Sequence, residues 1–165
     1  MNPDNRIAVC PGSYDPITYG HVDVISRASA IFDEVVVAVV NASVRKNKTL
    51  FDAEERVDFI ERAVGHLPNV RVETFDILIV DFARQLGARS IVKGLRAISD
   101  FEYELEMNQL NRQLASDIES VYLMASPQYS FLSSSGVKEI ATFGGDVSEL
   151  VPPEVARRLQ EALGR

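Results

Sequence analysis

The sequence predicts an α/β fold, a single doubly wound, Rossmann-like domain with a five-stranded parallel sheet and helices on both faces. Apolar runs with strand character alternate from end to end with segments of helical period, and strict β–α alternation is typical of a parallel sheet. The 165 residues contain no internal repeat, low-complexity segment or linker rich in Gly, Pro and Ser. We therefore expect one domain over residues 1–165, built around one sizeable core.

Five segments have strand character. The second, residues 35–40, is a β-branched run, as expected for a strand buried on both faces of a parallel sheet. The first is followed by Pro11 and Gly12, which together are a turn signal. In chain order, the predicted strands are residues 7–10, 35–40, 70–75, 90–92 and 121–124.

Six segments have apolar residues at helical spacing. Gly87 stops the third of them, and Pro153 suits the first turn of the last. The predicted helices are residues 21–32, 54–67, 78–86, 100–114, 134–143 and 153–163. Ligands of such folds bind at the carboxyl ends of the strands, so the loops that follow the strands are where chemistry is expected.

Composition narrows the function classes. Lys and Arg number 17 against 24 Asp and Glu, a net charge of −7, so non-specific binding of nucleic acid is not expected. No apolar run approaches the ~20 residues of a membrane span, and the N-terminus has no secretory pattern. The single cysteine, Cys10, cannot form an internal disulfide, which fits a reducing cytoplasm. Because the chain as a whole is negatively charged, an anionic ligand must be held by a local group of cations.

The first loop, residues 10–21, follows the first strand and opens a helix. Backbone amides and the helix dipole can receive a phosphate there. Thr18 could cap the helix, and His21 would lie in its first turn. A capped helix entry with a surface histidine is the alternative, but the position after the first strand and the nearby glycines favour a functional His21. His66, at the end of an amphipathic helix, is assigned no chemistry.

Two further loops carry cations. Arg45, Lys46 and Lys48 follow the second strand, where they form either a solvated turn or a set of phosphate ligands. Lys93 and Arg96 follow the fourth strand, and an exposed cation pair there has no structural task. Between them, Gly94 lets the backbone approach a ligand.

The loop after the fifth strand contains three consecutive serines, Ser133, Ser134 and Ser135, at the start of a predicted helix. One serine suffices for an N-cap, which leaves two hydroxyls for a triphosphate or pyrophosphate, with Lys138 adding charge one turn further on. The sequence has no Cys/His metal set, nucleophile elbow or P-loop. Direct displacement at phosphorus, without a covalent intermediate, is the chemistry that remains.

At these positions the sequence resembles the bacterial phosphopantetheine adenylyltransferases, within the nucleotidyltransferase superfamily marked by T/H-x-G-H. The motifs that carry the resemblance are P-G-S-Y-D-P-I-T-Y-G-H, F-D-A-E-E-R-V, K-G-L-R-A-I-S-D-F-E-Y-E and Y-S-F-L-S-S-S-G-V-K-E. The resemblance implies transfer of an adenylyl group from ATP to 4′-phosphopantetheine, a step of coenzyme A biosynthesis that gives dephospho-coenzyme A and pyrophosphate. It also implies Mg²⁺ carried by ATP, with no metal site on the protein, and a homohexamer.

The resemblance assigns roles to individual residues. It implies that His21, Lys46 and Ser134 act at the reaction centre. The implied phosphopantetheine set is Ser13, Lys46, Ile79 and Lys93. The implied ATP set is Ser13, Tyr14, His21, Gly94, Leu95, Arg96, Glu104, Tyr129, Ser130, Phe131, Leu132, Ser133, Ser134 and Ser135.

The loop lysine departs from the family pattern, and Gly136 stands where an apolar residue is usual. The family's loop lysine falls on Asn47, so that Lys46 or Lys48 could take its role, and we assign it to Lys46. Two rival functions remain open at this point. The first is adenylyl transfer to nicotinate mononucleotide, and the second is a non-catalytic nucleotide-binding module that regulates a partner.

Overall fold

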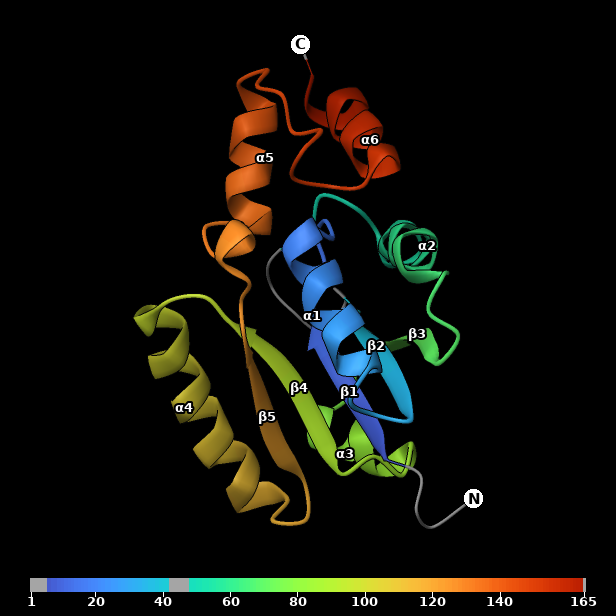
Figure 1. Cartoon of the computed structure of the whole chain (residues 1–165), viewed down its shortest axis with the longest axis vertical. Coiled ribbons are helices and arrows are strands. Elements are labelled where there is room, and N and C mark those ends of the chain that lie inside the picture. Colours follow the sequence, from blue (N-terminus) through green and yellow to red (C-terminus); the bar gives the residue numbers. More distant parts are fainter. Residues whose placement is uncertain (1–5, 42–47, 165) are drawn as a thin grey trace.

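The structure is a computed structural model that describes residues 6–41 and 48–164. Five parallel strands form one sheet in the order β3-β2-β1-β4-β5, which confirms the predicted fold class (Figure 1). The strands are β1 (Ile7–Gly12), β2 (Glu34–Val40), β3 (Val70–Phe75), β4 (Ser90–Leu95) and β5 (Glu119–Met124).

Within these residues, six helices connect or follow the strands, together with the short 3₁₀ turn η2. They are α1 (Tyr19–Ser29), α2 (Ala53–Val64), α3 (Ile79–Gln85), α4 (Ile98–Leu114), η2 (Pro127–Tyr129), α5 (Ser134–Thr142) and α6 (Pro153–Leu163). Figure 1 shows α1 in front of the sheet and α3 behind it, with α4 alongside β5. Within the described ranges, no helix has the length and apolar content needed to cross a bilayer.

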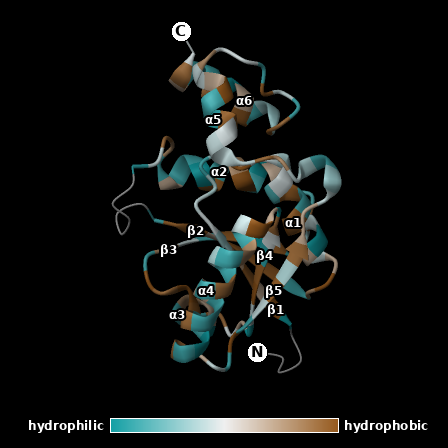
Figure 2. Ribbon diagram, turned by 90° about the vertical axis from the view of Figure 1, so that its left-hand side faces the viewer, coloured by the Kyte–Doolittle hydropathy of each residue, from teal (hydrophilic) through white to brown (hydrophobic). Residues whose placement is uncertain are grey.

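The strand β2, which lies between β3 and the middle strand β1, is part of the core. Its residues Val35 to Val39 are fully buried, because helices cover both faces of the sheet at this position. On one face, Val37 and Val39 pack with α2, α5 and α6, while on the other Val36 and Ala38 pack with α3. The brown central strands in Figure 2 mark this apolar layer.

Two strands extend beyond their predicted carboxyl ends, while β2 and β5 begin one and two residues earlier than predicted. β1 continues through Pro11 and Gly12, which pair with β2, and β4 continues through Lys93, Gly94 and Leu95, which pair with β5. The turn signals are overridden because a neighbouring strand is present to pair with each backbone. Lys93, Gly94 and Leu95 therefore lie inside a strand, where the sequence predicted a loop.

The strands β1 and β4 separate toward their carboxyl ends. They pair only at Ala8–Ser90 and Val9–Ile91, whereas β1 remains paired with β2 as far as Gly12. The strand order reverses at this same place, since β2 and β3 lie on one side of β1 and β4 and β5 lie on the other. Such a switch point is where open α/β sheets bind ligands.

Candidate active site

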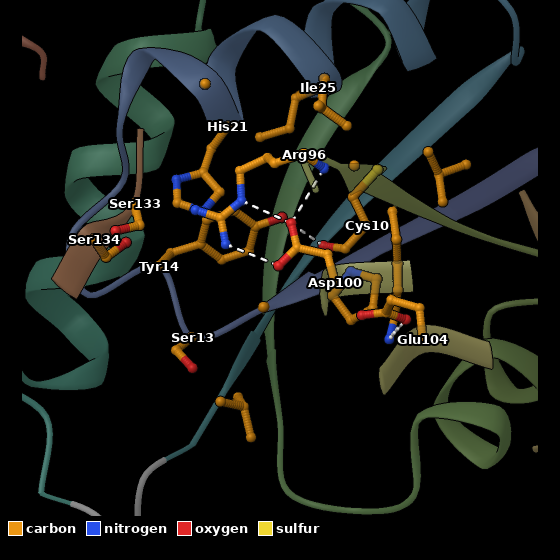
Figure 3. A pocket seen from close by; sticks show the side chains of 18 of the residues that line it. Cys10, Ser13, Tyr14, His21, Ile25, Arg96, Asp100, Glu104, Ser133 and Ser134 are labelled. Carbon is orange, nitrogen blue, oxygen red and sulfur yellow. Dashed lines mark hydrogen bonds and ion pairs between the residues drawn. The ribbon is translucent and has the colours of Figure 1, made fainter. Parts of the chain in front are cut away.

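A pocket of about 840 Å³ opens where β1 and β4 separate (Figure 3). Its walls come from the segments that follow β1, β3, β4 and β5, as the strand-end argument predicts. The predicted site residues that line it are Ser13, Tyr14, Ile79, His21, Lys93, Gly94, Arg96, Glu104, Tyr129, Leu132, Ser133, Ser134 and Ser135. Segments more than a hundred residues apart in sequence thus meet in one cavity.

Four predicted site residues are not part of this wall. Leu95 is buried, while Ser130 and Phe131 are exposed away from the pocket lining. Lys46 lies outside the described residues, as do Arg45 and Asn47. The assignments of these four residues remain predictions.

His21 occupies the first turn of α1, as expected, and is part of a capping box with Thr18. The Thr18 hydroxyl accepts from the His21 amide, and the Thr18 amide donates to Nδ1 of the imidazole at 3.0 Å. Because a backbone amide can only donate, Nδ1 is the accepting nitrogen, and the proton of the neutral ring lies on Nε2. His21 therefore presents an N–H donor, with its tautomer set by the helix cap.

The surroundings of His21 keep it neutral. Burial, and secondly the positive charge of Arg96, lower the pKa of the imidazole from 6.5 to about 4. Its ring lies edge to face with the ring of Tyr14, at a centroid distance of 5.1 Å (Figure 3). A neutral N–H donor near a cation suits an anionic oxygen in the pocket.

The two cations at the carboxyl end of β4 are both paired with carboxylates from α4. Lys93 Nζ lies 2.8 Å from Glu104 Oε2. The guanidinium of Arg96 forms a two-point contact with the carboxylate of Asp100 (Figure 3). The expectation that this cation pair has no structural task is therefore wrong. The first turns of α4 lie close enough to neutralise both charges, which the sequence alone does not reveal.

Arg96 also connects two walls of the pocket. Its Nη1 donates to the Leu132 carbonyl at 2.7 Å, so the end of β4 is joined to the segment before α5. Burial would raise the pKa of Asp100, but its hydrogen bonds with Arg96 outweigh that effect and lower it. Arg96 and Asp100 thus form an ionised pair in the wall of the pocket.

The three serines have three different surroundings. The Ser133 hydroxyl caps α5 by accepting from the Gly136 amide. The Ser134 hydroxyl donates to the Pro16 carbonyl at 2.7 Å, so it is not surplus as the sequence suggested. Ser135 is exposed in the pocket lining. The Gly136 amide is used by the Ser133 cap, but the amides of Ser134 and Ser135 before it have no helical acceptors and can receive a phosphate.

Lys138 has a structural partner instead of a place in the pocket. Its Nζ lies 2.8 Å from the carboxylate of Asp15, which is 5% exposed. Asp15 also accepts from the amides of Leu50 and Phe51. This carboxylate therefore joins the loop after β1 to the segment before α2 and to α5, and the charge predicted for the pocket is used in the fold.

Arg56 was not among the predicted site residues, yet it is fully buried and contacts the first site loop. Its Nη1 donates to the carbonyls of Ser13 and Val40, and its Nε donates to those of Phe51 and Asp52. Arg56 therefore holds the first site loop against the end of β2. One feature of the sequence could have revealed this role: Arg56 lies four residues before Ile60, on the apolar face of α2.

Among the described residues, no three His, Cys, Asp or Glu side chains gather as a metal site. Glu104 and Asp100, the carboxylates nearest the pocket cations, are already paired with Lys93 and Arg96. These residues therefore do not suit a metal held by the protein alone.

Comparison with known proteins identifies a family and a shared fold. The family model described as cytidylyltransferase-like matches residues 9–140. A putative nicotinate-nucleotide adenylyltransferase from Vibrio parahaemolyticus superposes with a TM-score of 0.71 at 17% identity, covering 98% of this chain and 96% of that one. A nicotinic acid mononucleotide adenylyltransferase from Plasmodium falciparum, complexed with NaAD, gives a TM-score of 0.70 at 15% identity, with 95% of each chain covered. At these identities the superpositions establish the shared fold.

Proposed function

Since the chain belongs to the cytidylyltransferase-like family, we propose that it transfers an adenylyl group from ATP to the phosphate of 4′-phosphopantetheine, forming dephospho-coenzyme A and pyrophosphate. Nucleotidyl transfer follows from the family, whereas the acceptor is our proposal. We place the reaction in the cytoplasm, where Cys10 would stay a buried thiol whose pKa burial raises to about 12.

The observation that carries the acceptor assignment is an apolar rim on one side of the pocket, made of Ile77, Leu78 and Ile79. Ile77 and Leu78 are 41% and 56% exposed, and all three residues line the pocket after β3. The three serines line it after β5, at the other end of the strand order. The long, largely uncharged pantetheine arm suits the apolar rim, and the triphosphate of ATP suits the side with the serines.

The chemistry would be an in-line displacement at the α-phosphorus of ATP. The attacking oxygen belongs to the acceptor phosphate, which is already ionised near neutral pH, so no general base is needed. The Nε2–H of His21 would donate to the α-phosphate as negative charge develops there, and the first amides of α5 would hold the leaving pyrophosphate. Mg²⁺ would arrive as part of the ATP substrate.

Substrate binding would replace the carboxylate partners of Lys93 and Arg96 with phosphate groups. An acceptor phosphate near Lys93 and a nucleotide phosphate near Arg96 would compete with Glu104 and Asp100 for the same N–H donors. Both carboxylates lie on α4, so release of either cation would free a carboxylate to accept hydrogen bonds from the bound nucleotide.

A substitution in the apolar rim tests the acceptor assignment. Leu78→Asp should raise KM for phosphopantetheine by about tenfold or more, because it places a carboxylate beside an apolar arm and an anionic phosphate. KM for ATP should change by less than about threefold. Equal effects on both substrates, or no effect on either, would contradict the placement of the acceptor along this rim.

We also propose that the chain assembles with itself as a hexamer, through the face of α4. None of the 17 residues of α4 is buried, and β5 beside it is an edge strand. The large apolar residues exposed there are Ile98, Phe101, Tyr103, Leu105, Leu110, Leu114 and Met124. A face of this kind marks an association surface.

Light scattering tests the hexamer. The wild-type protein should have six times the mass of one chain, and Leu110→Glu should reduce this mass. A wild-type monomer would contradict the proposal.

A further inference from the structure

Tyr14 has a backbone conformation that favours glycine. Its φ is 49°, in the left-handed region that large side chains rarely adopt. An aromatic residue persists there only where the contacts of its side chain compensate for the strain. Tyr14 is only 6% exposed, so most of these contacts are with the protein itself.

Two of the contacts fix the Tyr14 ring to β1. The hydroxyl donates to the Cys10 carbonyl at 2.9 Å, at the first residue beyond the last β1–β4 pair. The ring also lies against the backbone of Gly12, where an added Cβ would come within 2.9 Å of the ring atom Cε2. The end of β1 is thus shaped to hold an aromatic ring at this position.

The third contact is with His21. The two rings meet edge to face, with an interplanar angle of 64° and a centroid distance of 5.1 Å (Figure 3). The Thr18 amide holds the imidazole at Nδ1, which fixes one point of the ring. The Tyr14 ring supports the imidazole from a second direction, and two such restraints fix the direction of the Nε2–H bond.

We propose that Tyr14 is a positioning residue whose ring holds the imidazole of His21 in place, with the Tyr14 hydroxyl fixing that ring to the end of β1. The consequence for turnover rests on the proposed function, but the positioning of His21 does not. The groups that face His21 are Thr18 from the same loop, Tyr14, and the cation of Arg96 from the β4–α4 connection. Of these, only Tyr14 supplies an aromatic surface.

The chain has two histidines, so imidazole NMR resonances can be assigned directly with a His66→Asn variant. In the wild type, NOEs should connect the Tyr14 ring protons with the imidazole protons of His21, and Nδ1 should be the unprotonated nitrogen. Tyr14→Leu keeps a large non-glycine residue at this strained backbone position and removes the aromatic ring. It should raise the pKa of His21 by at least about one unit and lower kcat about tenfold, with KM for ATP within about threefold.

Tyr14→Phe is the matched variant, because it retains the ring and loses only the hydroxyl contact. It should keep the Nδ1-accepting tautomer and the low pKa of His21 and should lose less turnover than Tyr14→Leu. A folded Tyr14→Leu protein with the wild-type imidazole resonances, pKa and kcat would overturn the proposal. If Tyr14→Leu does not fold, absence of the ring-to-ring NOEs in the wild type, or a Tyr14→Phe protein with a raised His21 pKa, would overturn it. The resonances require no substrate, so a failure of the phosphopantetheine assignment leaves this test intact.

Discussion

Replacing Arg56 by Met should lower the free energy of unfolding by about 3 kcal/mol. The guanidinium is fully buried and donates to four carbonyls. The Asp52 carbonyl would still accept from the backbone amide of residue 56, but the Ser13 and Val40 carbonyls would lose a charged donor. Each such bond contributes roughly 1.5–3 kcal/mol, and relief from burying a charge offsets part of the sum.

Urea unfolding followed by far-UV circular dichroism measures this loss, since the chain has no tryptophan. Arg62→Met on the same helix is the control. Arg62 is 63% exposed and forms a surface pair with Asp58, so its loss should leave the midpoint nearly unchanged. An Arg56→Met protein within about 0.5 kcal/mol of wild type would refute the view that this residue holds the first site loop.

Three further outcomes can be measured. His21→Ala should lower turnover by about 10²-fold or more with little change in unfolding free energy, and near-normal turnover would remove His21 from the mechanism. Because the pKa of His21 falls from 6.5 in the unfolded chain to about 4 in the fold, the unfolded chain binds the proton first as the pH drops. Stability should therefore decrease between pH 6.5 and 4, by up to about 3 kcal/mol from this residue. Urea unfolding of His21→Asn should show a smaller loss of stability in acid than the wild type, and an identical loss would contradict a neutral, partly buried imidazole in the fold. Lys46→Ala and Lys48→Ala should have unequal effects on kcat/KM, whereas equal small losses would show that neither lysine is a phosphate ligand.

Much of the architecture was predictable because it depends on local pattern. Alternating strands and helices require a parallel sheet, and a parallel sheet brings the segments after its strands to one edge. His21, Lys93, Arg96 and the serines were therefore predicted to lie near one another, and all of them line one pocket. Thr18 as the cap of α1 was also predictable, since capping is a local interaction.

The partners of the charged residues were not predictable, because they depend on how the elements pack. Asp15 accepts from amides about 35 residues away, and Lys93 pairs with a carboxylate on the next helix. Strand ends were misplaced at Gly12 and Leu95 for the same reason, since pairing with a neighbouring strand outweighs a local turn signal. Arg56 carried a signal in its position on the apolar face of α2, but its acceptors come from three separate segments.

Pyrophosphate release from ATP and Mg²⁺, measured with and without 4′-phosphopantetheine, tests the central claim most directly. Nicotinate mononucleotide serves as the control acceptor, because both superposed structures are described as adenylyltransferases for it. We predict release that depends on phosphopantetheine and is absent with the control. Release only with nicotinate mononucleotide would contradict the proposed acceptor, and ATP binding without release in either case would contradict catalysis altogether.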